Sequence, residues 1–167
     1  VDVGMIGTVW EESDLPLQNV TYYTPFATDD HKLIIKIFDD LNQNLPELRD
    51  SWHSENLVHL STLVTDSYDI YGTDQIKTLE DLDNIRLNAP GTSANWLKGT
   101  GATPVDGGLT TYYTNIQTGV TNGTLSFASG IGPARVHEVA TELTRVGFGS
   151  MAFGAVAVNK RFFDDLP

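Results

Sequence analysis

The chain contains no cysteine among its 167 residues. A thiolate nucleophile, a disulfide bond and a zinc site built on thiolates are therefore excluded. The chain also lacks any apolar run close to the ~20 residues that a membrane-spanning helix requires. We therefore expect a soluble protein that does not insert into a membrane.

Basic residues are scarce. Ten Lys and Arg stand against 22 Asp and Glu, which gives a formal net charge of −12. Neutralising nucleic-acid phosphates requires clustered cations, whereas the cations here are dispersed along the chain. The charge balance argues against nucleic acid as a partner and is more typical of a surface that confers solubility.

Catalytic motifs are missing as well. The chain has no G-x-S-x-G, no H-E-x-x-H, no P-loop and no G-x-G-x-x-G after a strand. The four histidines, at positions 31, 53, 59 and 137, are far apart and lack the spacing of metal ligands. We therefore expect no enzymatic activity, no cofactor and no metal site.

Apolar residues make up an ordinary share of the chain, and no segment is repetitive or low in complexity, which argues against disorder. A chain of this length can bury about 70% of its unfolded surface. It has no initiator Met and no signal peptide, and it opens within an apparent strand. We expect a processed or truncated chain.

Apolar spacing predicts alternating strands and helices. Leu, Ile and Phe recur at helical spacing over residues 33–45, with Asp29 as the N-cap and Asn159 capping a final turn. We expect further helices at 92–99, 109–118 and 133–143, and extended segments at 1–7, 57–63, 66–72, 85–88, 102–105, 124–128 and 148–158. This alternation predicts an α/β fold with a largely parallel sheet flanked by helices. Ligands bind such sheets outside the carboxyl ends of the strands.

Several short motifs occur in a characteristic order. They are VDVGMIGTVW at 1–10, IKTLEDL at 76–82, Pro90-Gly91, GATPV at 101–105, YYTNIQTGVTNG at 112–123 and VNKRFFDDLP at 158–167. In this order and spacing the chain closely resembles the solute-binding proteins of TRAP transporters, the DctP-type family, over nearly its whole length. Members of that family are roughly twice as long. The resemblance therefore implies a chain without the N-terminal part and the C-terminal helices.

The resemblance implies a type II periplasmic-binding-protein-like fold with one lobe complete and the other partial. Residues 1–65 would form the partial first lobe, and residues 66–158 the second, ligand-binding lobe with the crossing segments. Residues 159–167 would start the return segment.

The implied function is that of a periplasmic, extracytoplasmic receptor, which captures a small organic acid between two lobes. It would deliver this ligand to the membrane permease subunits of a TRAP transporter. The alternative is the ligand-sensing domain of a membrane signalling receptor, which would carry a transmembrane helix and a kinase or cyclase domain in the full gene. An enzyme on the same fold would require an activated nucleophile or metal cluster that the sequence lacks.

The resemblance also implies where the ligand is held. The family usually carries a ligand-clamping arginine in a pattern like KIRxPG, and aligning on Pro90-Gly91 places Asn88 at that position and Arg86 at the family's lysine. An arginine holds a carboxylate with a fixed two-pronged fork, whereas asparagine offers one neutral amide. Arg86 shares a strand face with Asn88 and is either a surface residue or a second contact.

Further contacts follow from the same alignment. Tyr68 stands where several family members carry another arginine, and Ser126 replaces the asparagine of an ENP-like stretch. Leu109 replaces a frequent phenylalanine, and Trp10 is either a cleft wall or a core residue.

One of two adjacent helical tyrosines, Tyr112 and Tyr113, must face the core, and we place Tyr113 there. A ring ligand would stack on Trp10, Tyr68 and Tyr113. The lost arginines disfavour a small aliphatic dicarboxylate and favour a monocarboxylate, an aromatic acid or a neutral polyol.

Overall fold

The computed structural model describes residues 2–167. These residues form two compact units. Unit 1 comprises residues up to 24 together with 30–65 and 150–167, and unit 2 comprises residues 25–29 and 66–149. No helix within residues 2–167 combines the length and the apolar character needed to cross a membrane.

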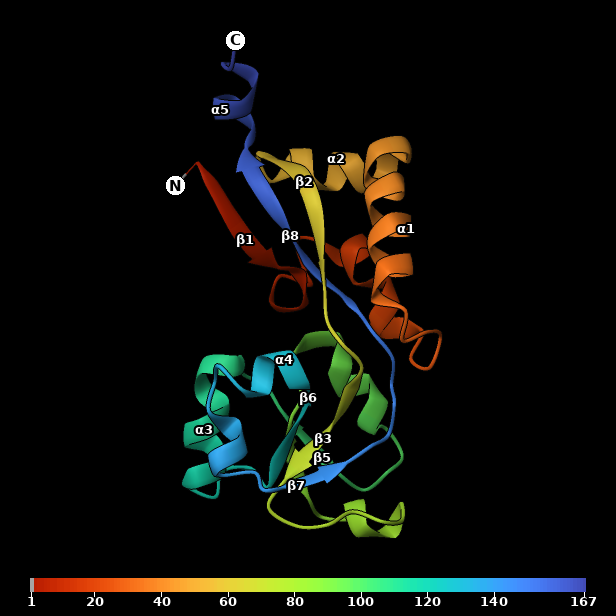
Figure 1. Cartoon of the computed structure of the whole chain (residues 1–167), viewed down its shortest axis with the longest axis vertical. Helices are drawn as coiled ribbons and strands as arrows, with labels where there is room; N and C mark the ends of the chain where they lie inside the picture. The colour runs from red at the N-terminus through yellow and green to blue at the C-terminus, as the bar shows by residue number, and fades with distance from the viewer. Residues whose placement is uncertain (1) are drawn as a thin grey trace. The chain divides into compact units, whose positions relative to one another are not determined.

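Unit 1 is built on a three-stranded antiparallel sheet. Its central strand is β8 (Ala152–Asn159), which pairs with β1 (Val3–Gly7) on one side and β2 (Leu57–Val64) on the other (Figure 1). The strands at 1–7 and 57–63 were expected. The sequence did not predict that β8 runs antiparallel to both neighbours, because the pattern of one extended segment does not show which strands it pairs with.

A glycine sets the strand spacing at the centre of this sheet. Gly154 lies opposite Gly7 on β1 and Leu63 on β2. A Cβ atom at Gly154 would collide with the carbonyl oxygen of Ile6. Only a residue without a side chain therefore fits here, which matches the use of glycine where two backbones approach closely.

Two helices pack against β2, namely α1 (His31–Asn44) and α2 (Pro46–Ser54) (Figure 1). Asp30 caps α1, because its Oδ1 accepts a hydrogen bond of 3.1 Å from the Leu33 amide. The sequence prediction of Asp29 as the cap was therefore wrong by one residue. Ile34 and Phe38, four residues apart, turn the same face of α1 into the core.

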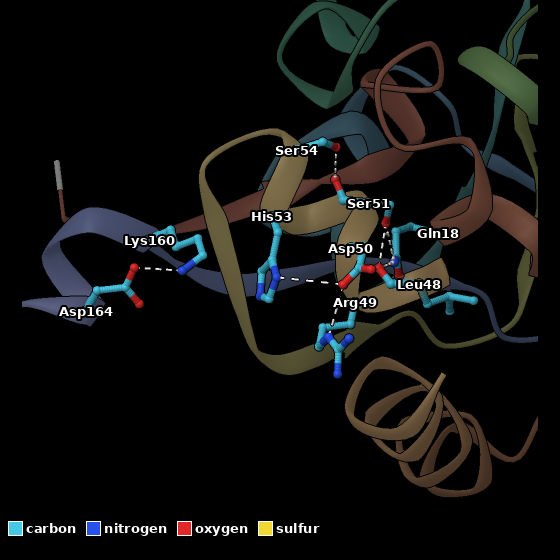
Figure 2. Close-up of polar contacts among 9 residues, drawn as sticks. All are labelled: Gln18, Leu48, Arg49, Asp50, Ser51, His53, Ser54, Lys160 and Asp164. Atoms are coloured by element: carbon cyan, nitrogen blue, oxygen red, sulfur yellow. Dashed lines mark hydrogen bonds and ion pairs between the residues drawn. The ribbon is translucent and has the colours of Figure 1, made fainter. Parts of the chain in front are cut away.

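Buried amides join these helices to the 3₁₀ segment η2 (Pro16–Tyr23). Gln18 Nε2 donates to Asn42 Oδ1 at 2.9 Å, to the Leu48 carbonyl at 3.1 Å and to Ser51 Oγ at 3.1 Å. Trp52 Nε1 donates to the same Asn42 oxygen at 2.9 Å. Figure 2 shows Gln18 beside Leu48 and Ser51 of α2, and Arg49 and His53 of the same helix in contact with Asp50.

The chain ends in the short helix α5 (Lys160–Asp164). Asn159 Oδ1 accepts a 3.2 Å hydrogen bond from the Phe162 amide, as the sequence predicted. Lys160 and Asp164 form an ion pair along the same helix (Figure 2).

Unit 2 contains a five-stranded sheet in the order β5-β4-β6-β3-β7. Its strands are β3 (Tyr68–Gly72), β4 (Arg86–Asn88), β5 (Thr103–Val105), β6 (Gly123–Phe127) and β7 (Glu142–Thr144). Only β4 pairs in parallel, with β5 and with β6, whereas β3 is antiparallel to both β6 and β7. The prediction of a largely parallel sheet was wrong, because the order of elements along the chain does not fix the direction of β3.

Helical elements of unit 2 are short. They are α3 (Leu109–Gln117), α4 (Ala128–Ile131) and three 3₁₀ segments, η3 (Glu80–Leu82), η4 (Gly91–Leu97) and η5 (Val136–Glu138). The helix expected at 133–143 does not form. Arg135 adopts a left-handed φ of 57°, which interrupts the helical path, and Glu142–Thr144 joins the sheet as β7.

Replacing Gly154 with alanine should destabilise unit 1 by about 1–3 kcal/mol, because the added methyl group must push β1 away from β8. Gly132→Ala is the matched control, since a Cβ there meets no atom within 4 Å and the backbone is already helical. Urea unfolding measures both changes. Equal effects of the two substitutions would contradict the close-approach explanation.

The stability of unit 1 should also depend on pH through His59. Burial lowers the pKa of this side chain, and the opposing effect of Asp39, whose Oδ1 lies 3.7 Å from Nε2, is smaller. The unfolded chain therefore takes up this proton first as the pH falls below about 6.5. We expect the free energy of unfolding to decrease between pH 7.5 and 5.5 in urea titrations. His59→Gln should flatten this decrease, and an unchanged slope would refute the assignment to His59.

Candidate functional site

The carboxyl ends of β4 and β6 lie next to each other in unit 2. These strands run in parallel, with Leu87 opposite Gly123 and Asn88 opposite Thr124. We define the carboxyl edge as residues 88–92 and 126–129. Neither stretch contains an acidic or basic residue, so the carboxyl edge has no formal charge of its own.

Asn88 closes β4 and is fully buried. Its Nδ2 donates to Thr121 Oγ1 at 2.9 Å and to the Gly123 carbonyl at 3.0 Å. Its Oδ1 accepts a 2.8 Å hydrogen bond from Asn115 Nδ2 on α3. Both amide hydrogens are therefore engaged within unit 2, and the side chain connects β4, α3 and the turn before β6.

Arg86 lies at the opposite end of β4 from the carboxyl edge and is exposed. Its Nη2 donates a 2.7 Å hydrogen bond to the Gly119 carbonyl, just after α3 ends at Gln117. A cation at the end of a helix satisfies free carbonyl groups and interacts favourably with the helix dipole. The structure thus gives Arg86 a helix-capping contact.

Ser126 lies near the carboxyl end of β6, and Leu109 is the first residue of α3. Ser126 is buried, and its Oγ has no hydrogen-bond partner among residues 2–167. Leu109 begins α3 and packs against the core cluster of Tyr112 and Ile131. Leu109 also lies within 3.3 Å of the place where a Cβ of Gly130 would stand, which brings α3 beside the start of α4.

Tyr68 opens β3, opposite Phe127 on β6. Its ring is buried and contacts two other aromatic rings. The ring of Trp96 lies edge-on, with 5.4 Å between the ring centroids, and the ring of Phe127 is tilted, with 5.2 Å between the centroids. Trp96 in turn stacks on Phe148 at 4.8 Å. Tyr68 is therefore a member of a continuous aromatic cluster that sequence reasoning did not identify.

The two helical tyrosines are arranged opposite to our prediction. Tyr112 is buried, at 2% exposure, and Tyr113 is only half-buried. Tyr112 shares its helix face with Ile116, four residues later, which packs in the same cluster. Burial raises the pKa of Tyr112, and a hydrogen bond with Thr124 opposes that rise. Tyr112 therefore stays uncharged to a higher pH than an exposed tyrosine does.

Trp10 belongs to unit 1, where it closes the 3₁₀ segment η1 (Thr8–Trp10). Its ring lies over Gly7 and meets Phe153 edge-on at 5.0 Å. It nevertheless remains 41% exposed. Trp10 thus combines a packed edge with an accessible face.

An apolar cavity of about 440 Å³ lies within unit 2. This volume falls in the range of small-molecule sites. Arg145 and Lys77 are the basic residues on its wall. The remaining lining residues are Pro25, Phe26, Ile70, Ile76, Thr78, Leu79, Leu82, Trp96, Leu97, Thr100, Thr144, Val146 and Phe148.

Thr92, in η4 just beyond β4, was not among the residues that the sequence predicted as ligand contacts. Thr92 is 1% exposed, and its Oγ1 has no hydrogen-bond partner in the described part of the chain. The start of η4 has no side-chain cap, and the neighbouring Ser93 Oγ donates back to the Pro90 carbonyl at 2.7 Å. The only signal for Thr92 was its place two residues after Pro90. Among residues 2–167 no group of three His, Asp or Glu could hold a metal ion.

The Asn88 network generates a stability prediction. Asn88→Ala should lower the free energy of unfolding by about 1–3 kcal/mol, because Asn115 and Thr121 lose their buried partner. Asn115→Ala removes a single bond and should cost less. A double-mutant cycle measured in urea should show coupling between the two residues, and strictly additive effects would contradict the network.

The chain was compared with known protein families and structures. The family model described as "DctP: Bacterial extracellular solute-binding protein, family 7" matches residues 13–167. A TRAP periplasmic solute-binding protein from Sulfitobacter sp. NAS-14.1 with bound β-D-galacturonate has a TM-score of 0.82 at 19% identity. The alignment covers 100% of this chain and 55% of that one. The comparison with curated proteins found no match.

Two further solved structures show the same fold. DctP6 of Bordetella pertussis, an extracytoplasmic solute receptor binding pyroglutamic acid, has a TM-score of 0.81 at 20% identity, over 99% of this chain and 54% of that one. A TRAP periplasmic solute-binding protein from Rhodoferax ferrireducens with bound malonate has a TM-score of 0.80 at 18% identity, over 100% and 53%. The chain thus spans about half the length of these relatives.

The match covers most of the chain, and it confirms the predicted family, its periplasmic location and its non-enzymatic character. The fold agrees with a mixed α/β architecture shared with TRAP solute-binding proteins over half their length. The chain belongs to the DctP family of bacterial extracellular solute-binding proteins.

Proposed function

We propose that the protein is a receptor that captures a small organic acid between two lobes, as the resemblance implies, and delivers it to a TRAP-type membrane permease. The observation that carries this proposal is the family match over residues 13–167. Fold similarity to receptors bound to galacturonate, pyroglutamic acid and malonate supports it.

The carboxyl edge supports a preference within the organic acids. It contains no cation, and Arg86 is engaged at the far end of β4 with the Gly119 carbonyl. A buried carboxylate without a paired cation is unfavourable by several kcal/mol. A ligand that presents a hydroxylated ring to this edge therefore fits better than a small aliphatic dicarboxylate, which carries two charges.

The proposed contact residues differ in whether their polar groups already have hydrogen-bond partners within the chain. The Ser126 hydroxyl is unpartnered, whereas the Asn88 amide is already engaged. Tyr68 is an aromatic neighbour within unit 2, and Trp10 offers an accessible indole face in unit 1. Ser126 is thus the contact to which the ligand-free chain lends most support, with Leu109 and Tyr113 on α3 as the remaining candidates.

A thermal-shift and calorimetry series on the full-length protein tests the proposal. The ligands are D-galacturonate, D-glucuronate, pyroglutamate, malonate and succinate. We expect a sugar acid or pyroglutamate to bind, and a ligand at 100 times its Kd should stabilise the protein by about 2.7 kcal/mol. Succinate that binds tenfold more tightly than the sugar acids would refute the ligand preference. An absence of binding to all five acids would refute the proposed function.

A further inference from the structure

The apolar cavity of unit 2 has no role in the function proposed above. Its described wall includes no residue of the carboxyl edge and none of the proposed ligand contacts. It lies instead against β3, through Ile70, and against η3 and η4, through Leu82 and Leu97. All of its described lining residues belong to unit 2. The cavity is therefore a separate feature of this unit, with the volume of a small-molecule site.

Three of the lining residues are aromatic and contact one another in series. Trp96 stacks on Phe148, with 4.8 Å between the ring centroids, and the ring of Phe26 is tilted against Phe148, with 5.3 Å between the centroids. Phe148 is buried, whereas Phe26 is 62% exposed. Aromatic rings offer a large apolar area and a preferred stacking geometry to another ring. This part of the wall is therefore suited to a flat apolar group.

Phe26 is held in an unusual backbone conformation. Its φ of 69° lies in the left-handed region, which is rare for a bulky residue. The Phe26 amide donates a 2.5 Å hydrogen bond to the Phe148 carbonyl, so a contact within unit 2 fixes this residue at the cavity. Backbone strain of this kind is concentrated at active sites, ligand clamps and switch regions. The conformation of Phe26 therefore favours a role in binding over a role in packing.

The charged residues on the described cavity wall are both basic. They are Lys77 and Arg145, two of the ten cations in a chain with a net charge of −12. Arg145 forms no ion pair within the described part of the chain. The carboxylate of Asp69 accepts instead from the amides of Val146 and Gly147, both at 2.8 Å. An anion in the cavity would therefore meet an arginine that has no carboxylate partner among the described residues.

Lys77 is less available than Arg145. The Oδ2 atom of Asp81 accepts hydrogen bonds of 2.9 Å from the amides of Lys77 and Thr78. These hydrogen bonds, and to a smaller extent the Lys77 charge, lower the pKa of Asp81. The charge of Lys77 is therefore partly offset by a nearby carboxylate. Arg145 is the better contact for a ligand carboxylate, because a planar guanidinium holds it with two parallel hydrogen bonds.

We propose that this cavity is a second small-molecule site, which binds an organic monoanion with an aromatic body. The rings of Phe26, Trp96 and Phe148 contact the aromatic body, and Arg145 pairs with the carboxylate. The site goes beyond the proposed function, because it lies outside the carboxyl edge and does not depend on the ligand bound there.

The composition of the wall limits the class of ligand. The uncharged polar residues on its described part are Thr78, Thr100 and Thr144. A sugar acid would bury several hydroxyl groups against apolar side chains, and hydroxyls without hydrogen-bond partners are unfavourable there. A dicarboxylate would bring in a second charge, which is more unfavourable still. We therefore expect an aromatic monocarboxylate such as phenylacetate to bind in preference to both.

The experiment uses the full-length protein with phenylacetate as the probe. Calorimetry measures the Kd and the stoichiometry of phenylacetate, first alone and then with the protein saturated by whichever of the five acids tested above binds best. We expect one phenylacetate per protein molecule, with a Kd that saturation leaves unchanged. Phenylacetamide keeps the ring and lacks the charge. It should bind about tenfold more weakly, because the charge-assisted hydrogen bonds to Arg145 are lost.

Two variants test the two kinds of contact. Arg145→Gln should weaken phenylacetate binding about tenfold and leave phenylacetamide binding unchanged. Phe26→Asn should weaken binding of both compounds about fivefold, and asparagine tolerates the left-handed conformation at this position. Arg135→Gln is the matched control, because Arg135 is an exposed arginine of unit 2 that pairs with Glu138 and does not line the cavity. This control should leave both affinities unchanged.

The remaining outcomes would each decide against one proposal. Failure of the full-length protein to bind phenylacetate would overturn the second site and would indicate that another part of the protein or a second copy fills the cavity. Displacement of phenylacetate by the saturating acid would overturn it as well, as would wild-type affinity in both Arg145→Gln and Phe26→Asn. Phenylacetate binding that depends on Arg145, in a protein that binds none of the five acids, would keep the second site and refute the proposed function alone.

Discussion

The hydrogen bonds of the Asn88 side chain tie β4 to α3 and to the start of β6 in unit 2. They reach α3 through Asn115 and the start of β6 through Thr121 and Gly123. The parallel register of β4 and β6, and hence the place of both carboxyl ends, depends on this buried amide. A fully satisfied buried network fixes one arrangement more strongly than apolar packing alone.

Charge is kept away from this network. Arg86, the first residue of β4, donates a hydrogen bond to the Gly119 carbonyl just beyond α3. Burial raises the pKa of the Tyr112 phenol. In β3, burial and the charges of Asp69 and Asp66 raise the pKa of Tyr71 to about 12. The polar side chains of the carboxyl edge itself are thus an amide and hydroxyls, and the charge that contacts it is the carboxylate of Asp66, which accepts hydrogen bonds from the amide and the hydroxyl of Ser129.

Much of the fold was predictable from local patterns. The turn at Pro90-Gly91, the cap at Asn159 and the strands around Leu87 and Leu125 all follow from residue chemistry within a few positions. The wrong predictions concern the pairing of strands that lie far apart in the sequence. Whether β3 runs parallel or antiparallel to β6 depends on residues more than fifty positions apart, and residues 142–144 became a strand because β3 offered a free edge.

The site was predictable to a lesser degree. Alignment to the family selected Asn88 and Ser126 separately, and the structure adds that their strands, β4 and β6, pair in parallel. The alignment could not reveal that the Asn88 amide has hydrogen-bond partners within unit 2 whereas the Ser126 hydroxyl has none, because the partners of Asn88 include Asn115 and Thr121 from other elements. The orientation of Tyr112 and Tyr113 failed for a related reason, since only the packing of Ile116 and Val136 decides which face of α3 is inside.

The central strand of the unit 1 sheet has a consequence for the order of folding. β8 spans Ala152–Asn159 and pairs with β1 and β2, which precede it by about 150 and 95 residues. Pairings between such distant segments form slowly, because a long loop must close before any contact is gained. Unit 2 is nearly continuous in the chain. Unit 2 can therefore fold before β8 has paired with β1 and β2. Until β8 pairs with them, β1 and β2 expose unpaired strand edges, and these edges are the part of the folding protein most prone to wrong association.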